Sequence, residues 1–235
     1  MKKTKSFEFK QFKIEGGFSG MPVSTDGVLL GAWMELAQVK RLLDIGTGTG
    51  LLSLMCAQRS ELLAIEAIDI DQHALNAATK NFNHSKWSDR LTLHKGDVLR
   101  YSFNDLYDAI ICNPPYFNSG QHAANSTRAT ARHTQTLNHE DLLRRCWQLL
   151  TAKGHACFVL PIAEGEQFIQ LAIADGWFLQ RKCSVKPTDK KVVSRLLIQL
   201  GKLPQDCIEE SLNIHEQGQY SSDFVKLTQD FYLKM

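Results

Sequence analysis

The chain has 235 residues, enough to bury one sizeable core, and its formal net charge of +2 lies close to zero. This charge excludes a globally basic nucleic-acid binder, so any basic surface must be local. Hydrophobic residues make up 43% and charged residues 22%, as is ordinary for a soluble globular protein. The six cysteines form no C-x-x-C pair, and no stretch has the length of a membrane span. We therefore expect a reduced, cytoplasmic protein with no metal centre and no membrane segment.

The N-terminal segment contains two predicted elements. Residues 7–14 nearly alternate between apolar and polar side chains, which predicts a short strand with one exposed face. Residues 21–34 follow, where Ser24, Thr25 and Asp26 are candidate N-caps of a helix. For Asp26 a role at a functional site is an equally good interpretation.

A glycine-rich loop follows the first buried strand, which is predicted over residues 39–45. Asp44 is followed by Gly46, Gly48 and Gly50, and residues 51–59 are predicted to be helical. Glycines at alternate positions allow a tight turn and a close approach of backbone amides to a ligand. The Asp44 carboxylate would repel a phosphate and attract an ammonium group. This pattern favours S-adenosylmethionine over NAD.

Acidic residues end the next two predicted strands, over residues 62–70 and 90–94. Asp69 lies about 20 residues past the glycine loop, where a carboxylate can bind ribose hydroxyls. We choose it over Asp71, which is placed to cap the helix predicted at 72–82. Asp97 could accept a hydrogen bond from the exocyclic amine of an adenine, and Ile70 and Val98 could form apolar walls around the ring. A cap of a helix is an equally good account of Asp97.

The segment 113–116 is the main candidate for the chemistry. The apolar run Tyr107–Cys112 predicts a buried parallel strand, and two prolines then end it at the edge where open α/β sheets bind ligands. Asn113, Pro114 and Tyr116 present an amide, a rigid carbonyl and an aromatic ring together. This set suits a planar group that carries an amino nitrogen. The alternative is a loop in which Asn113 caps a turn and Tyr116 covers the core.

Basic residues further along the chain are candidate substrate contacts. Arg128 and Arg132 lie four residues apart in the polar segment 117–136, so they would share one helix face. They either contact substrate phosphate or form a solvated face. Lys186, Lys190 and Lys191 lie between or within two strands predicted over 178–185 and 191–200, an antiparallel pair at the sheet edge. A basic edge suits an RNA backbone, although charged edge strands also prevent aggregation.

The alternation of strands and helices predicts the fold class. We expect an α/β protein with a Rossmann-like, seven-stranded, mostly parallel sheet, helices on both faces and the last strand antiparallel. Residues 1–235 are expected to form a single domain. Its parts are an N-terminal strand and capped helix over 1–38, a catalytic core over 39–200, and a C-terminal tail over 201–235 that docks on the core.

These motifs together resemble a known family. D-x-G-x-G-x-G at 44–50, the acidic strand end, Gly96-Asp97 and N-P-P-Y at 113–116 resemble class I S-adenosylmethionine-dependent methyltransferases that methylate amino groups. The segments F-E-F-K-Q-F-K-I at 7–14, T-D-G-V-L-L-G-A-W at 25–33 and D-F-Y-L-K at 230–234 resemble the bacterial tRNA1(Val) adenine-N6 methyltransferase family. The resemblance covers nearly the whole chain.

The resemblance implies a reaction, a cofactor and a partner. The reaction is N6-methylation of the adenine beside the anticodon of tRNA1(Val), with S-adenosyl-L-methionine as cofactor and tRNA as partner. Asn113 and the Pro114 carbonyl would orient the exocyclic amine, and Tyr116 would stack on the flipped base. Ribosomal RNA guanine-N2 methylation, protein glutamine-N5 methylation and a non-catalytic RNA-binding module stay open, as does the oligomeric state. The cofactor-binding residues implied are Thr25, Asp44, Gly46, Gly48, Gly50, Asp69, Ile70, Asp97, Val98 and Asn113.

Overall fold

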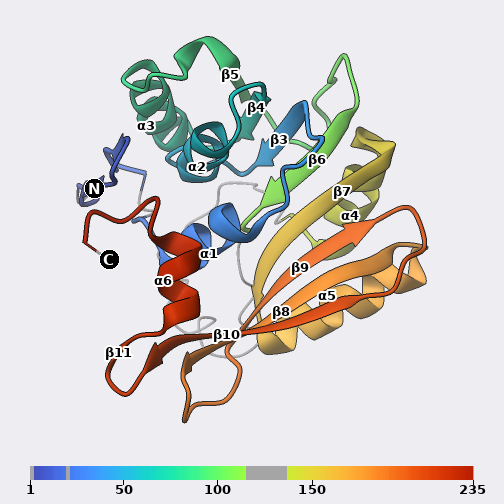
Figure 1. The fold of residues 1–235 in the computed structure, drawn as a ribbon. Helices are drawn as coiled ribbons and strands as arrows, with labels where there is room; N and C mark the ends of the chain where they lie inside the picture. Colours follow the sequence, from blue (N-terminus) through green and yellow to red (C-terminus); the bar gives the residue numbers. More distant parts are fainter. Residues whose placement is uncertain (1–2, 20–21, 115–136, 235) are drawn as a thin grey trace, which may run out of the picture.

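The computed structural model describes residues 3–19, 22–114 and 137–234. Figure 1 shows one large twisted sheet with helices packed on both faces, and a small N-terminal hairpin beside it. The helices are α1 (Thr25–Trp33), α2 (Leu51–Arg59), α3 (Gln72–Asn83), α4 (His139–Leu149), α5 (Ile162–Ala174) and α6 (Ser222–Thr228). The strands are β1 (Phe7–Glu8), β2 (Lys13–Ile14), β3 (Arg41–Ile45), β4 (Ala64–Asp69), β5 (Leu91–Lys95), β6 (Tyr107–Cys112), β7 (Leu150–Pro161), β8 (Phe178–Thr188), β9 (Arg195–Gly201), β10 (Ile208–Glu216) and β11 (Gln219–Tyr220).

The large sheet has the order β11-β10-β8-β9-β7-β6-β3-β4-β5. Strands β3, β4, β5, β6 and β7 pair in parallel, whereas β9 runs antiparallel to both of its neighbours, β7 and β8. Strand β8 therefore points in the same direction as β7. Seven strands thus form the predicted α/β sheet, mostly parallel with one antiparallel strand, which confirms the expected fold class.

The predicted strand count was too low, because the C-terminal segment adds two strands. Strand β10 pairs in parallel with β8, and β11 pairs with β10, so β8 and β9 are not the edge of the sheet. Leu212 is the buried residue of β10 in a strand that is otherwise half-buried or exposed. A strand with so little apolar pattern gives no signal that a sequence reading can separate from a polar tail.

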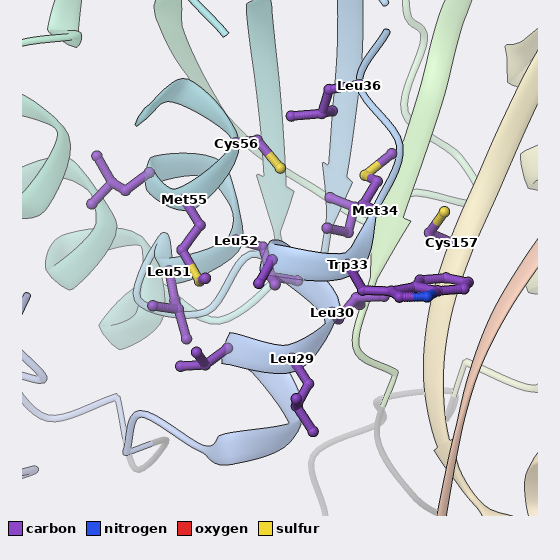
Figure 2. Packing of buried hydrophobic residues seen from close by; sticks show 14 of the residues in the cluster. Leu29, Leu30, Trp33, Met34, Leu36, Leu51, Leu52, Met55, Cys56 and Cys157 are labelled. Atoms are coloured by element: carbon purple, nitrogen blue, oxygen red, sulfur yellow. The ribbon is translucent and has the colours of Figure 1, made fainter. Parts of the chain in front are cut away.

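Alternating side chains of each core strand face opposite layers of the molecule. Leu42 packs with α1 and α2 in one hydrophobic cluster, while Leu43 packs with α4 and α5 in the other. Figure 2 shows how closely α1 and α2 meet in the first cluster. At Gly31 of α1, an added Cβ would lie 2.8 Å from the Met55 sulfur of α2. Close packing here fixes where α1 begins, which matters for the site described below.

The N-terminal segment differs from the predicted single strand. Residues 7–14 form a hairpin of β1 and β2, closed by a hydrogen bond from the Phe9 amide to the Phe12 carbonyl (2.8 Å). The helix after it begins as expected, since the Ser24 side chain accepts a hydrogen bond from the Gly27 amide (3.1 Å). Ser24 is therefore the N-cap of α1, while Thr25 and Asp26 lie in its first turn.

Candidate active site at the carboxyl edge of the sheet

The glycine loop connects the end of β3 to α2 and has the backbone conformation that its glycines predict. Gly46, Gly48 and Gly50 have φ angles of +68°, +59° and +84°, which side chains other than glycine rarely adopt. At Gly50 a Cβ would also lie 2.4 Å from a ring carbon of Phe82 in α3. At Gly46 an added Cβ would meet no atom of the described chain within 4 Å, so this side of the loop is open. The loop backbone therefore borders open space at Gly46, although the amides of Gly46, Gly48 and Gly50 already donate hydrogen bonds within the protein.

Asp44 is completely buried beneath this loop. Its Oδ2 accepts hydrogen bonds from the Thr47 hydroxyl (2.7 Å), the Ser53 hydroxyl (2.6 Å) and the Ser53 amide (3.1 Å). Its Oδ1 is buried and has no hydrogen-bond partner among the described residues. Burial raises the pKa of Asp44 to about 6, and the nearby charge of Asp69 adds to the effect, against the opposing hydrogen bonds of Ser53 and Thr47. The carboxylate thus ties the strand end to α2 and keeps one oxygen unused.

Asp69 lies at the end of β4, beside the glycine loop. Its Oδ2 accepts from the Gly48 amide (2.8 Å), and its Oδ1 accepts from the Asp71 amide (2.9 Å). Asp71 caps α3 through hydrogen bonds from the amides of His73 (2.9 Å) and Ala74 (2.8 Å). The capping role predicted for Asp71 is therefore confirmed. Asp69 is left at the strand end, next to the loop, with one backbone amide hydrogen-bonded to each carboxylate oxygen.

Asp97 opens a turn next to the end of β4. The Gly96 amide donates to the Asp69 carbonyl (3.0 Å), which places this turn beside the previous strand. The Asp97 side chain accepts from the Leu99 amide (3.0 Å), so it caps a turn and not a helix. Val98 is buried in the second hydrophobic cluster, whereas Ile70 is 56% exposed at the same edge. The two apolar residues thus stand in different environments, with Ile70 open to solvent.

Asn113 and Pro114 follow β6 directly, half-buried and buried respectively. A Cβ added to Gly27 would lie 4.0 Å from the Asn113 Nδ2 and 3.5 Å from the Ser24 hydroxyl oxygen. The first turn of α1, which includes the exposed Thr25, therefore lies against Asn113. Figure 1 shows the short α1 near the tip of β6. Tyr116, Arg128 and Arg132 lie outside the described residues.

An ion pair that sequence reasoning missed braces this turn of α1. The Nε of Arg195, the first residue of β9, donates to Asp26 Oδ2 at 2.8 Å, and both side chains are mostly buried. In the sheet, Arg195 is paired in register with Pro161 at the carboxyl end of β7. Asp26 does not cap α1, whose N-cap is Ser24, and its side chain joins α1 to β9 instead. No local pattern could have linked two residues that are 169 positions apart.

The lysines predicted to contact RNA lie at the same edge of the sheet. Lys186 is half-buried near the end of β8, and Lys190 and Lys191 are exposed in the turn that follows. Because β8 points in the same direction as β6, its carboxyl end faces the same side as Asn113. Two strands, β7 and β9, separate them in the sheet.

Comparison with known proteins identifies the class of protein to which this chain belongs. The family model described as methyltransferase small domain matches residues 10–159. The structure of a predicted O-methyltransferase from Agrobacterium tumefaciens superposes with a TM-score of 0.67 at 16% identity, over 88% of this chain and 96% of that chain. A glycopeptide N-methyltransferase complexed with S-adenosyl-L-methionine superposes with a TM-score of 0.56 at 10% identity, over 75% and 87%. The chain belongs to the methyltransferase small domain family.

Curated relatives narrow the family further. A tRNA1(Val) (adenine(37)-N6)-methyltransferase from Vibrio vulnificus strain CMCP6 is 60% identical over 233 residues, which cover 99% of this chain and 98% of the relative. A protein of the same name from Vibrio parahaemolyticus is 59% identical over 232 residues, covering 99% and 97%. The chain therefore belongs to the family of tRNA1(Val) (adenine(37)-N6)-methyltransferases, as its motifs predict.

No helix within residues 3–19, 22–114 and 137–234 is long and apolar enough to cross a membrane. Among the same residues, no group of three or more histidine, cysteine, aspartate or glutamate side chains is arranged to hold a metal ion.

Proposed function

We propose that the chain methylates the N6 atom of adenine 37 in tRNA1(Val), the reaction named for its relatives at 60% identity. The observation that carries this proposal is the position of Asn113. Its side chain lies at the carboxyl edge of a methyltransferase sheet, against the first turn of α1 and one strand away from the glycine loop. An amide there can bind an amino group close to a methyl donor.

The described residues fit S-adenosyl-L-methionine as the cofactor, which supplies an electrophilic methyl group on a sulfonium. The open side of the loop at Gly46 leaves room for a ligand to approach the backbone closely. The unused Oδ1 of Asp44 provides negative charge below the loop, which suits the ammonium of an amino-acid moiety. Asp69 is placed for the ribose hydroxyls. The remaining candidates for cofactor contacts are Thr25, Gly48, Gly50, Ile70, Asp97, Val98 and Asn113.

In this proposal Asn113 and Pro114 supply the chemistry by orientation. The exocyclic nitrogen of adenine is a poor nucleophile, because its lone pair is delocalised into the ring. When the Asn113 side-chain oxygen and the Pro114 carbonyl accept hydrogen bonds from its two N–H groups, the lone pair of the nitrogen is directed toward the methyl donor. Tyr116 stacks on the base after it leaves the anticodon loop. The product then sheds its proton to solvent, so no dedicated base is required.

The basic residues are proposed to bind the tRNA backbone. Lys186, Lys190 and Lys191 face the same side of the sheet as Asn113, and Arg128 and Arg132 follow Asn113 in the chain. Charge at this edge suits phosphate groups flanking the target base. We propose further that residues 1–235 act as one domain, because the C-terminal β10 joins the same sheet as the catalytic strands. The proposed tRNA substrate and the six free cysteines favour the cytoplasm as its location.

Mass analysis of nucleosides tests the proposal. Purified tRNA1(Val), the remaining tRNA, ribosomal RNA and a protein fraction from cells that lack this enzyme are each incubated with the protein and labelled S-adenosyl-L-methionine, then digested. We expect label in N6-methyladenosine from tRNA1(Val) alone. Label in N2-methylguanosine from ribosomal RNA, label in protein glutamine, or no transfer to any substrate would contradict it.

A further inference from the structure

The turn formed by residues 97–101 carries two candidate adenine contacts, Asp97 and Val98, but it is too short to support itself. Its internal backbone hydrogen bonds run from the amides of Arg100 (3.0 Å) and Tyr101 (2.8 Å) to the Asp97 carbonyl. These bonds leave the carbonyls of Val98 and Tyr101 without a partner inside the turn. The position of the turn must therefore be set by other elements.

Arg145 of α4 caps both of these carbonyls. Its Nε donates to the Val98 carbonyl at 2.8 Å, and its Nη2 donates to the Tyr101 carbonyl. Its Nη1 donates to Gln148 on the next turn of α4 (3.3 Å), and the guanidinium lies 5.8 Å from the centre of the Phe103 ring. Among the described residues Arg145 forms no ion pair. Its charge is therefore directed at the backbone of the turn.

The sheet holds the same turn from a second direction. The Tyr101 hydroxyl is hydrogen-bonded to His94 Nδ1 of β5 at 2.8 Å, and His94 Nε2 is in turn bonded to Glu66 of β4 at 2.7 Å. The Tyr101 ring also packs closely on the chain at Gly96, where a Cβ would lie 2.9 Å from a ring carbon. Tyr101 fixes one end of the turn, and Arg145 reaches across it to Val98.

We propose that Arg145 is a positioning residue for cofactor binding. It holds Asp97 and Val98 in the position that contact with the adenine ring requires. The proposal rests on the assignment of these two residues to the adenine in the proposed function. Arginine suits this task because its planar fork can donate to two carbonyls at once, which the single ammonium of lysine cannot do in the same geometry. The purely structural alternative is that Arg145 only pins α4 to the body of the protein.

Arg144 provides a matched control on the same helix. It is the preceding residue with the same charge, it is 60% exposed, and it forms looser ion pairs with Glu140 (3.8 Å) and Asp175 (3.5 Å). Exposed pairs of this kind contribute little to stability. Removal of Arg144 therefore reproduces the loss of charge and of a long side chain from α4, without touching the turn.

The test is calorimetric binding of S-adenosyl-L-methionine, and of 5′-methylthioadenosine as a probe of the nucleoside half, to Arg145→Ala, Arg145→Lys and Arg144→Ala. We expect Arg145→Ala to bind both ligands about tenfold more weakly, as for the loss of charge-assisted hydrogen bonds. The affinity of Arg145→Lys for both ligands should lie between those of Arg145→Ala and the wild type, and Arg144→Ala should bind with wild-type affinity. In turnover assays the KM for the cofactor rises, while the KM for tRNA and kcat stay within about twofold.

The binding measurements need no RNA, so they give an answer even where the proposed tRNA substrate is wrong. Wild-type affinity in Arg145→Ala, or an equal loss in Arg144→Ala, would overturn the positioning role. If Arg145→Ala does not fold, Arg145→Lys decides the matter, since the lysine keeps the charge and most of the packing. Wild-type affinity of a folded Arg145→Lys variant for both ligands would then contradict the proposal.

Discussion

The burial of Asp44 lowers the stability of the folded protein, and in the proposed function its charge serves cofactor binding. The folded protein keeps a proton on this carboxyl up to about pH 6, whereas the unfolded chain loses it near the ordinary value of 3.8. Between these values the folded state binds more protons than the unfolded state, so the free energy of unfolding falls as the pH rises. Above about pH 6 the carboxyl is ionised in both states, so its unfavourable contribution to the free energy of unfolding no longer changes with pH. The ionised group remains under the loop.

We expect Asp44→Asn to remove this dependence. The amide cannot ionise, while its oxygen can still accept from Ser53 and Thr47. The stability of the variant relative to the wild type should therefore increase from pH 4 to pH 6 and then stay level, as measured by denaturant unfolding across this range. Affinity for S-adenosyl-L-methionine should fall about tenfold at pH 7 through the lost charge. A stability difference that does not change with pH would refute this account of Asp44.

Residues whose conformation or capping role is set by local geometry were the most predictable part of the candidate site. The three glycines adopt the positive φ angles that their spacing predicts, and Asp71 caps its helix, which leaves Asp69 at the strand end. Arg145 was not predicted, because its partners are backbone carbonyls, which leave no trace in a sequence pattern. Asp26 was ambiguous for a related reason, since its partner Arg195 comes from a distant strand.

At the scale of elements, Arg181 of β8 connects the added strand β10 to the helix that faces the site. Its guanidinium forms a bidentate pair with Glu210 of β10 (2.9 and 3.0 Å) and lies 4.3 Å from the centre of the Trp33 ring of α1. The Trp33 indole also donates to Glu210 at 2.7 Å. These contacts hold β8, β10 and α1 together from three parts of the chain.

Arg181→Lys should lower the free energy of unfolding by about 1–3 kcal/mol, because lysine can neither form the fork nor stack as well on the indole. The measurement is chemical denaturation followed by tryptophan fluorescence. Lys182→Ala is the control, since Lys182 pairs with a mostly exposed Glu209 and should shift stability by less than about 0.5 kcal/mol. Equal changes in the free energy of unfolding for the two substitutions would show that the bidentate Arg181–Glu210 pair contributes nothing to stability.

Strong apolar elements were predicted well, and weakly patterned ones were not. The strand Tyr107–Cys112 has the predicted bounds, because every residue in it except Asp108 is buried. The sequence predicts one strand where β1 and β2 form a hairpin, since the aromatic residues Phe9 and Phe12 on either side of the turn are both buried. Strand β10 has no apolar run that would predict it, because pairing with β8 and the contacts of Glu210 hold it in the sheet.

At the scale of the whole molecule, the near-zero net charge makes the location of the lysines decisive. Lys186, Lys190 and Lys191 lie at the edge that faces the same side as Asn113, whereas Lys40 and Lys153 are exposed near the opposite ends of β3 and β7. RNA that binds at the active edge should release counterions through the first group only.

Replacing Lys186, Lys190 and Lys191 together with alanine should weaken tRNA binding and reduce the steepness of its salt dependence. The slope of log K against log salt should fall in magnitude by about 2, as for the loss of three phosphate contacts on single-stranded RNA. Filter binding at several salt concentrations measures it, and the Lys40→Ala, Lys153→Ala double variant is the control. An unchanged slope in the triple variant would place the RNA elsewhere.

The most direct test of the proposed mechanism is the single-turnover rate of methyl transfer to tRNA1(Val) by Asn113→Ala, with cofactor affinity measured on the same sample. If the Asn113 side chain orients the target amine, the rate should fall by about 100-fold or more, as for the loss of one preorganised polar contact at a reacting group. The affinity for S-adenosyl-L-methionine should stay within about threefold, because Asn113 is one of ten candidate cofactor contacts and the other nine, among them Asp44 and Asp69, are intact. Transfer at the wild-type rate would contradict the role of Asn113, and with it the proposed mechanism.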